Sequence, residues 1–293
     1  MILFNMLKDS DPAMAKEVET RASLIDGDYH ISQTKSRRQN IIDFFACYLS
    51  GVTYVPLRYD IHPNGLNEII KIIESNSLEG IQAIWSTSGT TGESKLVCHK
   101  RESIEWAVLQ SIKNWGYTKD DFVYCSELPN STAILMITLP AILVGADYLI
   151  KKFNNDDVRK NNFTMIGWIP EIVEMLDDDH SFKGTRVTMG GDVVKQIHVD
   201  KLNGVDKWWA SWSMTEVLMP GLIGVNNLIM NPYDGYEVKI NEKSELLIKG
   251  PGLMLGYLGK DRIGEWFNTS DIWEEVDGGY KFIQRAQSKV WHS

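Results

Sequence analysis

The stretch Ser86-Thr87-Ser88-Gly89-Thr90-Thr91-Gly92-Glu93-Ser94-Lys95 directly follows the short apolar run Ile81–Trp85. Its ten positions hold six hydroxyl side chains, two glycines and a terminal lysine. Glycine lets a backbone approach a polyanion closely, and neighbouring hydroxyl and N–H groups then donate hydrogen bonds to the anion's oxygens. A strand that leads into such a segment predicts a loop that binds the phosphates of a nucleotide.

A P-loop and a flexible linker are the two alternatives for this stretch. The P-loop of kinases and GTPases follows the pattern G-x-x-x-x-G-K-[ST]. From Gly89 this chain has G-x-x-G-x-x-K instead, and Lys95 is followed by Leu96, so the spacing argues against a P-loop. A flexible linker stays open at this point, because runs rich in Gly, Ser and Thr are often no more than that. The rest of the chain must decide between a linker and a binding loop.

Five further segments favour the binding loop, because they match one family in the right order. The loop is similar to the TSGTTGxPK signature of the acyl-adenylate-forming superfamily, which includes acyl-CoA synthetases, peptide-synthetase adenylation domains and firefly-type luciferases. The five segments resemble that superfamily's GxxYVPL, YGxTE, GELxIxG…GYL, TGD and GYxxxxGR blocks; they are Gly51–Leu57, Trp212–Glu216, Glu245–Leu258, Trp266–Asp271 and Gly279–Arg285. The resemblance runs from about Ser32 to the C-terminus and identifies the chain as a member of the superfamily, with its large N-terminal domain.

The composition is ordinary for a globular protein. Hydrophobic residues make up 43% and charged residues 24% of the 293 positions, which is enough for a substantial core. A net charge of −9 argues against nucleic acid as a partner. Three widely spaced cysteines, Cys47, Cys98 and Cys125, indicate neither a disulfide framework nor a zinc site, and they favour a cytoplasmic location. No apolar run reaches 18 residues, so we expect no membrane span.

The apolar pattern predicts an α/β fold with parallel sheets flanked by helices. Expected helices alternate with short expected strands along the chain: helices at 38–48, 66–73, 104–115 and 134–144, and strands at 52–57, 81–85, 148–150, 165–168 and 187–189. We expect residues 1–225 to form this α/β core. From residue 226 the sequence pattern changes to short runs of alternating apolar and polar residues separated by Gly-rich turns. This pattern predicts a smaller, mostly β subdomain over 226–293.

The resemblance implies ATP and Mg²⁺ as cofactors and a phosphate-binding role for the loop. The loop residues concerned are Thr87, Ser88, Gly89, Thr90, Thr91, Gly92 and Lys95. Thr215 would offer a hydroxyl to a phosphate oxygen, and Glu216 would bind the metal. A single carboxylate suffices for Mg²⁺ when substrate phosphates supply other ligands. We expect Thr87, Lys95, Thr215 and Glu216 to be the catalytic residues; the alternative for the Thr-Glu pair is a helix cap.

The same resemblance implies the nucleoside contacts. Trp212 stands where the superfamily has a tyrosine that stacks on adenine, and an indole can stack equally well. Gly191 and Asp192 belong to a glycine turn beside adenine. Asp271 and Arg285 would bind the ribose, the carboxylate by accepting both hydroxyl groups. The alternatives for these last two are a turn residue and a surface charge.

Besides Trp212, four residues depart from the family's blocks. Ser94 replaces a proline, and Ser213, Ser270 and Gln284 replace glycines, each adding a Cβ where close approach or a positive φ can be required. These changes remove no catalytic group, but they lower the activity we expect. The superfamily's mobile C-terminal lid domain is expected to be absent, since Lys289 is too close to Arg285 to be the lid's lysine. The chain would then be a shortened form, or a minimal one acting alone or with a lid supplied in trans.

The function implied is ATP-dependent activation of a small carboxylic acid to an acyl-adenylate, with release of pyrophosphate, by an AMP-forming ligase. CoA or an acyl-carrier protein is an open alternative for a second-step acceptor. Thr132 lies near the place of an amino-acid-binding aspartate, and Asn130 or Ser131 near a pocket gate, which favours an acid without an α-amine. The run 177–180 (Asp-Asp-Asp-His) indicates a solvated loop rather than a metal site. A degenerate nucleotide- or acyl-binding module and an interaction protein are the alternative functions.

Overall fold

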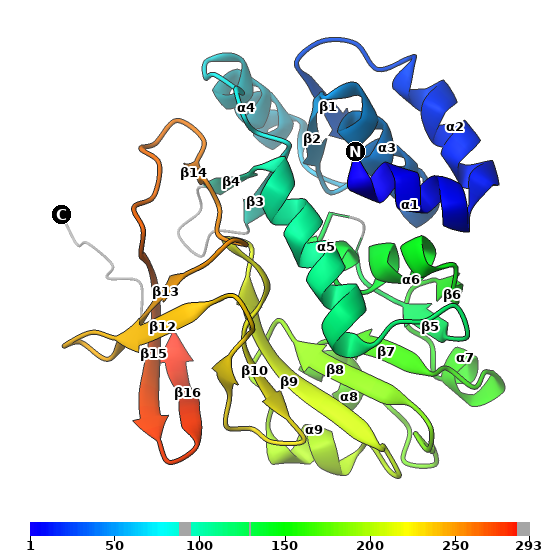
Figure 1. Cartoon of the computed structure of the whole chain (residues 1–293), viewed down its shortest axis with the longest axis vertical. Coiled ribbons are helices and arrows are strands. Elements are labelled where there is room, and N and C mark those ends of the chain that lie inside the picture. Colours follow the sequence, from blue (N-terminus) through cyan, green and yellow to red (C-terminus); the bar gives the residue numbers. More distant parts are fainter. Residues whose placement is uncertain (88–94, 129, 286–293) are drawn as a thin grey trace.

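Three β-sheets form the frame of the molecule (Figure 1). The computed structural model describes residues 1–87, 95–128 and 130–285. The first sheet contains, in spatial order, β1 (Tyr29–Ser32), β2 (Thr53–Pro56), β3 (Ala83–Thr87), β4 (Lys95–His99) and β14 (Gly256–Tyr257). The second contains β11 (Asn231–Pro232), β10 (Val217–Val225), β9 (Lys207–Met214), β8 (Arg186–Gly190), β7 (Met165–Trp168), β5 (Phe122–Cys125) and β6 (Asp147–Ile150). The third contains β12 (Glu237–Ile240), β13 (Glu245–Lys249), β15 (Phe267–Val276) and β16 (Gly279–Arg285).

Helices cover the first two sheets, which confirms the predicted α/β class. They are α1 (Ile2–Ser10), α2 (Pro12–Ala22), α3 (Arg37–Ser50), α4 (Pro63–Glu74), α5 (Arg101–Trp115), α6 (Thr138–Val144), α7 (Asn155–Lys160), α8 (Pro170–Glu174), α9 (Gln196–Asp200) and the 3₁₀-helix η1 (Thr132–Leu135). Strands β1–β3 are parallel, as are β9, β8, β7, β5 and β6. The strands added at one side of each sheet, β4 with β14 and β10 with β11, are antiparallel.

The third sheet is antiparallel throughout and forms the predicted β-rich subdomain. The expected boundary at residue 225 remains a prediction. Two short strands beyond it join the other sheets, because β11 pairs with β10 and β14 pairs with β4. The chain therefore returns to the α/β core after it has entered the C-terminal region.

Helix α5 lies between the first two sheets, at the centre of the molecule (Figure 1). Its residues Ile104 and Val108 are fully buried and share one core cluster with Trp85 of β3 and Met219 of β10. The Ser103 hydroxyl on the same helix donates to the Pro251 carbonyl at 2.6 Å. Since buried apolar area is the main stabilising contribution, α5 fixes how the two sheets face each other.

The prediction of one continuous helix over 134–144 is wrong, because the segment is divided into two helices. The structure has η1 up to Leu135 and α6 from Thr138. Pro140 has no N–H to donate to the Met136 carbonyl, and a proline ring clashes with the carbonyl four residues earlier. The Met136 carbonyl accepts from the Tyr117 hydroxyl instead, at 3.1 Å. The predicted helix end at Gly145 is confirmed, since that residue caps α6 in the left-handed conformation with φ +74°.

No helix among the described residues has the length and the apolar character that crossing a membrane requires.

Candidate functional site

The site begins at the β3–β4 hairpin, which carries the predicted phosphate loop. Thr87 ends β3, Lys95 begins β4, and the two residues are direct partners in the antiparallel register. The predicted contacts Ser88, Gly89, Thr90, Thr91 and Gly92 lie outside the described residues. The hairpin therefore places Thr87 and Lys95 at the two ends of that segment, with the Lys95 side chain exposed.

Thr215 and Glu216 form the turn that joins β9 to β10, not a helix cap. Glu216 is only 5% exposed. Its Oε1 accepts a hydrogen bond from the Tyr257 hydroxyl at 2.8 Å. The Lys95 Nζ lies 5.1 Å from the centroid of the same tyrosine ring. One aromatic side chain thus links a predicted phosphate-binding cation to the predicted metal ligand.

A buried histidine supports the backbone of this turn. His99 of β4 is fully buried, and its Nε2 lies 2.8 Å from the Thr215 carbonyl. Because a carbonyl only accepts, Nε2 carries the proton. Burial lowers the pKa of His99 to about 4, so the ring is neutral near pH 7. Its Nδ1 has no partner among the described residues.

Asp271 of β15 connects the second and third sheets. The Trp212 indole N–H donates to its Oδ2 at 2.8 Å, and the Arg285 Nε lies 3.8 Å from its Oδ1. Asp271 is 6% exposed, and burial raises the pKa of its carboxyl group; the charge of Glu216 raises it further. Trp212 is itself 8% exposed, and Arg285 is largely exposed. The predicted ribose contacts therefore lie together and within electrostatic range of the predicted metal ligand.

Gly191 and Asp192 follow the carboxyl end of β8 and are both exposed. Gly191 has φ +81°, and a Cβ there would lie 3.2 Å from the Ile169 Cγ2, so glycine is required. The neighbouring β9 runs parallel to β8, with Gly190 opposite Ser211. This pairing brings the glycine turn to the same sheet edge as Trp212.

Of Ser213, Ser270 and Gln284, which stand where the resembled blocks have glycine, only Ser270 has a positive φ, of +59°. Ser213 and Gln284 lie within β9 and β16, in a backbone conformation that any residue can adopt. The strain expected from lost glycines is therefore confined to Ser270, one residue before Asp271.

The Glu216 carboxylate has the chemistry to bind Mg²⁺. Its Oε1 is held by Tyr257, and no donor in the described part of the chain binds Oε2. The preceding residue, Thr215, carries a hydroxyl, and carboxylate and hydroxyl oxygens are the hard ligands that Mg²⁺ prefers. By contrast, ligand atoms of Asp177, Asp179 and His180 lie within 4.8 Å of one another, but the Arg159 guanidinium binds both carboxylates. The positive charge of Arg159 thus already balances these carboxylates, and the arrangement is that of an ion-paired loop.

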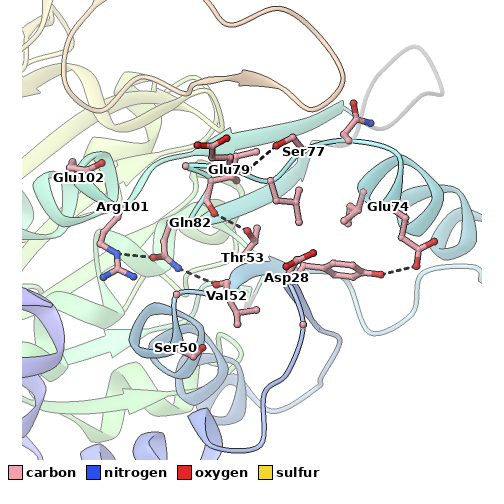
Figure 2. A pocket seen from close by; sticks show the side chains of 18 residues that line it. Asp28, Ser50, Val52, Thr53, Glu74, Ser77, Glu79, Gln82, Arg101 and Glu102 are labelled. Atoms are coloured by element: carbon pink, nitrogen blue, oxygen red, sulfur yellow. Dashed lines mark hydrogen bonds between the residues drawn. The ribbon is translucent and has the colours of Figure 1, made fainter.

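A polar hollow of about 880 Å³ lies at the opposite edge of the first sheet, where the parallel strands β1–β3 begin (Figure 2). Figure 2 shows Arg101 donating to Gln82, which in turn donates to the Val52 carbonyl. These polar groups satisfy one another. The hollow is lined by none of the predicted site residues.

Two residues of the site were not assigned a role from the sequence. Tyr257 stands in the GYL block, so its place in that block was an available signal. His99 carried none, because its partner is 116 positions away in the chain.

The comparisons with known proteins concern the sequence and the fold. The sequence model of one family, described as AMP-binding enzyme, matches residues 71–258. A 2-succinylbenzoate–CoA ligase of Listeria monocytogenes is 26% identical over 267 residues, covering 82% of this chain and 56% of the ligase. A 2-succinylbenzoate–CoA ligase of Staphylococcus epidermidis is 28% identical over 253 residues, covering 76% of this chain and 53% of the ligase. The chain spans about half the length of the curated relatives it matches.

Solved structures show the same fold. The O-succinylbenzoate coenzyme A synthetase of Bacillus subtilis, in complex with ATP and magnesium, has a TM-score of 0.76 at 16% identity, over 97% of this chain and 74% of that one. VinN with L-aspartate has a TM-score of 0.78 at 17% identity, over 96% of this chain and 97% of that one. At identities of 16% and 17%, this similarity shows that the chain shares the fold, and nothing more.

Proposed function

This chain belongs to the family of AMP-binding enzymes, and on that premise we propose that it activates a small carboxylic acid with ATP, forming an acyl-adenylate. The observation that carries the proposal is the cluster at the β9–β10 turn. There the Tyr257 side chain contacts both Lys95 and Glu216, and Trp212, on the strand that leads into this turn, donates to Asp271. A phosphate-binding cation, a metal-binding carboxylate and a ribose-binding carboxylate in one place suit a nucleotide that must react at its α-phosphorus.

In the proposed reaction a carboxylate oxygen of the acid attacks the α-phosphorus of ATP. A new oxygen–phosphorus bond forms, the bond to the β-phosphate bridging oxygen breaks, and pyrophosphate leaves with the electron pair. Two anions must meet, so positive charge and oriented donors have to offset their repulsion. Mg²⁺, when bound, neutralises phosphate charge. Lys95 and Thr87 orient the phosphates, and Thr215 with Glu216 hold the metal and a phosphate oxygen.

The nucleoside half of ATP is assigned to the third sheet and the β8–β9 edge. Asp271 accepts from the ribose hydroxyls, and Arg285 stays close to its second oxygen. Trp212, Gly191 and Asp192 form the wall for adenine. In this arrangement Trp212 acts on adenine through its ring while its N–H fixes Asp271.

The acid substrate and the acceptor belong to the proposal as well. The relatives named for 2-succinylbenzoate and the structure holding L-aspartate supply two acids to test first. CoA or an acyl-carrier protein would accept the acyl group in a second step. A cytoplasmic location is consistent with Cys47, Cys98 and Cys125, which are all unpaired and buried.

Trapping the intermediate tests the function. Hydroxylamine converts an acyl-adenylate into a hydroxamate, which is measured by colour or mass. We expect hydroxamate from Mg·ATP and at least one acid of a panel that includes 2-succinylbenzoate and L-aspartate. Glu216→Gln should lower the rate about 100-fold, because the second-sphere and ligand losses typical of metal sites cost 10–100-fold or more. Glu242→Gln, a change of an exposed glutamate, is the matched control.

The alternative function, a non-catalytic nucleotide-binding module, predicts a different result. Such a protein binds AMP but yields no hydroxamate with any acid. We expect Asp271→Asn to weaken AMP binding about tenfold through the lost ribose contacts, whereas Asp277→Asn, in the exposed turn after β15, should not. Absence of AMP binding in the unaltered chain would reject both functions and leave an interaction protein.

A further inference from the structure

We propose that Tyr257 is a positioning residue that holds the metal-binding carboxylate of Glu216 and the ammonium group of Lys95 in one fixed arrangement. This inference rests on the function proposed above, since it concerns the same site. Tyr257 need not touch the nucleotide. Its hydroxyl and its ring act on two different groups, and those groups come from two different sheets.

The backbone around Tyr257 is anchored on both sides of the site. On the phosphate-loop side, β14 pairs with β4, and the Leu258 N–H donates to the Leu96 carbonyl at 2.8 Å. On the other side, the Met254 N–H donates to the Glu216 carbonyl at 2.9 Å. The segment 254–258 therefore bridges the turn of the second sheet and the hairpin of the first, and Tyr257 lies within that bridge.

The Tyr257 hydroxyl binds one oxygen of Glu216 and leaves the other without a donor among the described residues. It donates to Oε1 at 2.8 Å, so Oε2 remains the oxygen available to Mg²⁺. Hydrogen bonds to an ionised carboxylate are shorter and stronger than neutral ones, and they fix its orientation.

The Tyr257 ring constrains Lys95 in a separate way. The ammonium group lies 5.1 Å from the ring centroid, within the range of a cation–π interaction. An exposed lysine side chain otherwise samples many rotamers. Attraction to the Tyr257 ring favours the rotamers that keep the Lys95 ammonium group over the ring. Removing the hydroxyl alone should thus affect the metal, whereas removing the ring should also affect the phosphates.

The test measures ATP binding at equilibrium, by calorimetry, with and without Mg²⁺. Tyr257→Phe should weaken Mg·ATP binding about tenfold through the lost charge-assisted hydrogen bond. It should leave metal-free AMP binding within about twofold of the parent, since it removes no nucleoside contact. Tyr257→Leu should weaken metal-free ATP binding as well. Tyr233→Phe is the matched control, because it removes another buried tyrosine hydroxyl, one that donates to the Gln110 carbonyl on α5.

A double variant makes the assignment specific. In the Glu216→Gln background, Tyr257→Phe should cause little further loss of Mg·ATP binding, because the carboxylate it positions is gone. An equal loss in both backgrounds, or no loss in the parent, would overturn the inference. Pyrophosphate exchange measured alongside separates the two proposals. If exchange occurs but Tyr257→Phe binds Mg·ATP as the parent does, this inference alone is rejected. If Tyr257→Phe weakens Mg·ATP binding but no exchange occurs, the catalytic function alone is rejected.

Discussion

At the scale of single residues, the polar groups of the site are held by hydrogen bonds that cross between distant parts of the chain. Glu216 is bound by Tyr257, Thr215 by His99 and Asp271 by Trp212. Each acceptor is buried or beside a buried group. At such a place, leaving a polar group without a partner costs more stability than a hydrogen bond adds on average. Removing one donor should therefore disturb its partner more than its immediate surroundings.

Ser270 is a non-glycine residue in the left-handed region of backbone conformation, at a position where the resembled family block has glycine. Its φ of +59° is unfavourable for any residue with a Cβ, and it directly precedes Asp271. Ser270→Gly should raise the free energy of unfolding by about 0.5–1 kcal/mol, after allowance for the greater freedom of glycine in the unfolded chain. Urea denaturation measures this change. A lower free energy of unfolding in the variant would contradict the assignment of strain to this position.

His99 should make stability depend on pH. A histidine in the unfolded chain has a pKa near 6.5, but burial lowers the pKa of His99 to about 4. Between these values the unfolded state binds more protons, so this contribution to stability is complete above about pH 6.5 and is lost as the pH falls toward 4.

The His99→Gln variant isolates that effect. The difference in free energy of unfolding between the parent and His99→Gln should shrink by about 2 kcal/mol from pH 7 to pH 5. His62→Gln, which changes an exposed histidine that caps α4, is the comparison for a solvent-exposed ring. Parallel pH profiles for the parent and His99→Gln would show that the buried ring does not titrate in the expected way.

At the scale of elements, the periodicity of apolar residues predicted α3, α4 and α5 and the core strands β2, β3, β6, β7 and β8, because those patterns are local. The break before α6 shows the limit of periodicity alone, since one proline divided a continuous apolar run. Similarly, the Thr215–Glu216 pair could be placed beside a strand from the apolar Trp208–Trp212 segment. The pair forms a tight turn because β9 and β10 are paired antiparallel. The Trp208–Trp212 segment alone does not specify that pairing.

The contact between β9 and β15 can be tested with two tryptophans that touch each other edge to face, at 5.6 Å between ring centroids. Trp212 donates to Asp271, whereas the Trp273 indole N–H has no partner among the described residues. Replacing either by phenylalanine opens a similar cavity. Trp212→Phe should cost about 1.5–3 kcal/mol more than Trp273→Phe, which is the value of a hydrogen bond to a charged group.

Denaturant unfolding of both variants provides this comparison. Equal losses would mean that the indole–carboxylate bond does not help to join the second sheet to the third.

At the scale of the whole molecule, the site exists only where the three sheets meet. The hairpin comes from the first sheet, the Thr215–Glu216 turn from the second and Asp271 from the third. The sequence blocks supplied the candidate site residues, because each block is short and keeps its order, and the assignment of those residues to a nucleotide site stays a prediction. They gave no role to His99 or Tyr257, since those roles arise from contacts between sheets and not from neighbours in the chain.

The most direct measurement of the central claim is acid-dependent exchange of labelled pyrophosphate into ATP, with the parent chain, Glu216→Gln and the control Glu242→Gln. The reaction reverses adenylation, so it reports formation of the acyl-adenylate without needing an acceptor. The account predicts exchange with at least one acid, an approximately 100-fold loss in Glu216→Gln and normal exchange in the control. Exchange that persists in Glu216→Gln, or no exchange with any acid from a chain that binds ATP, would contradict it.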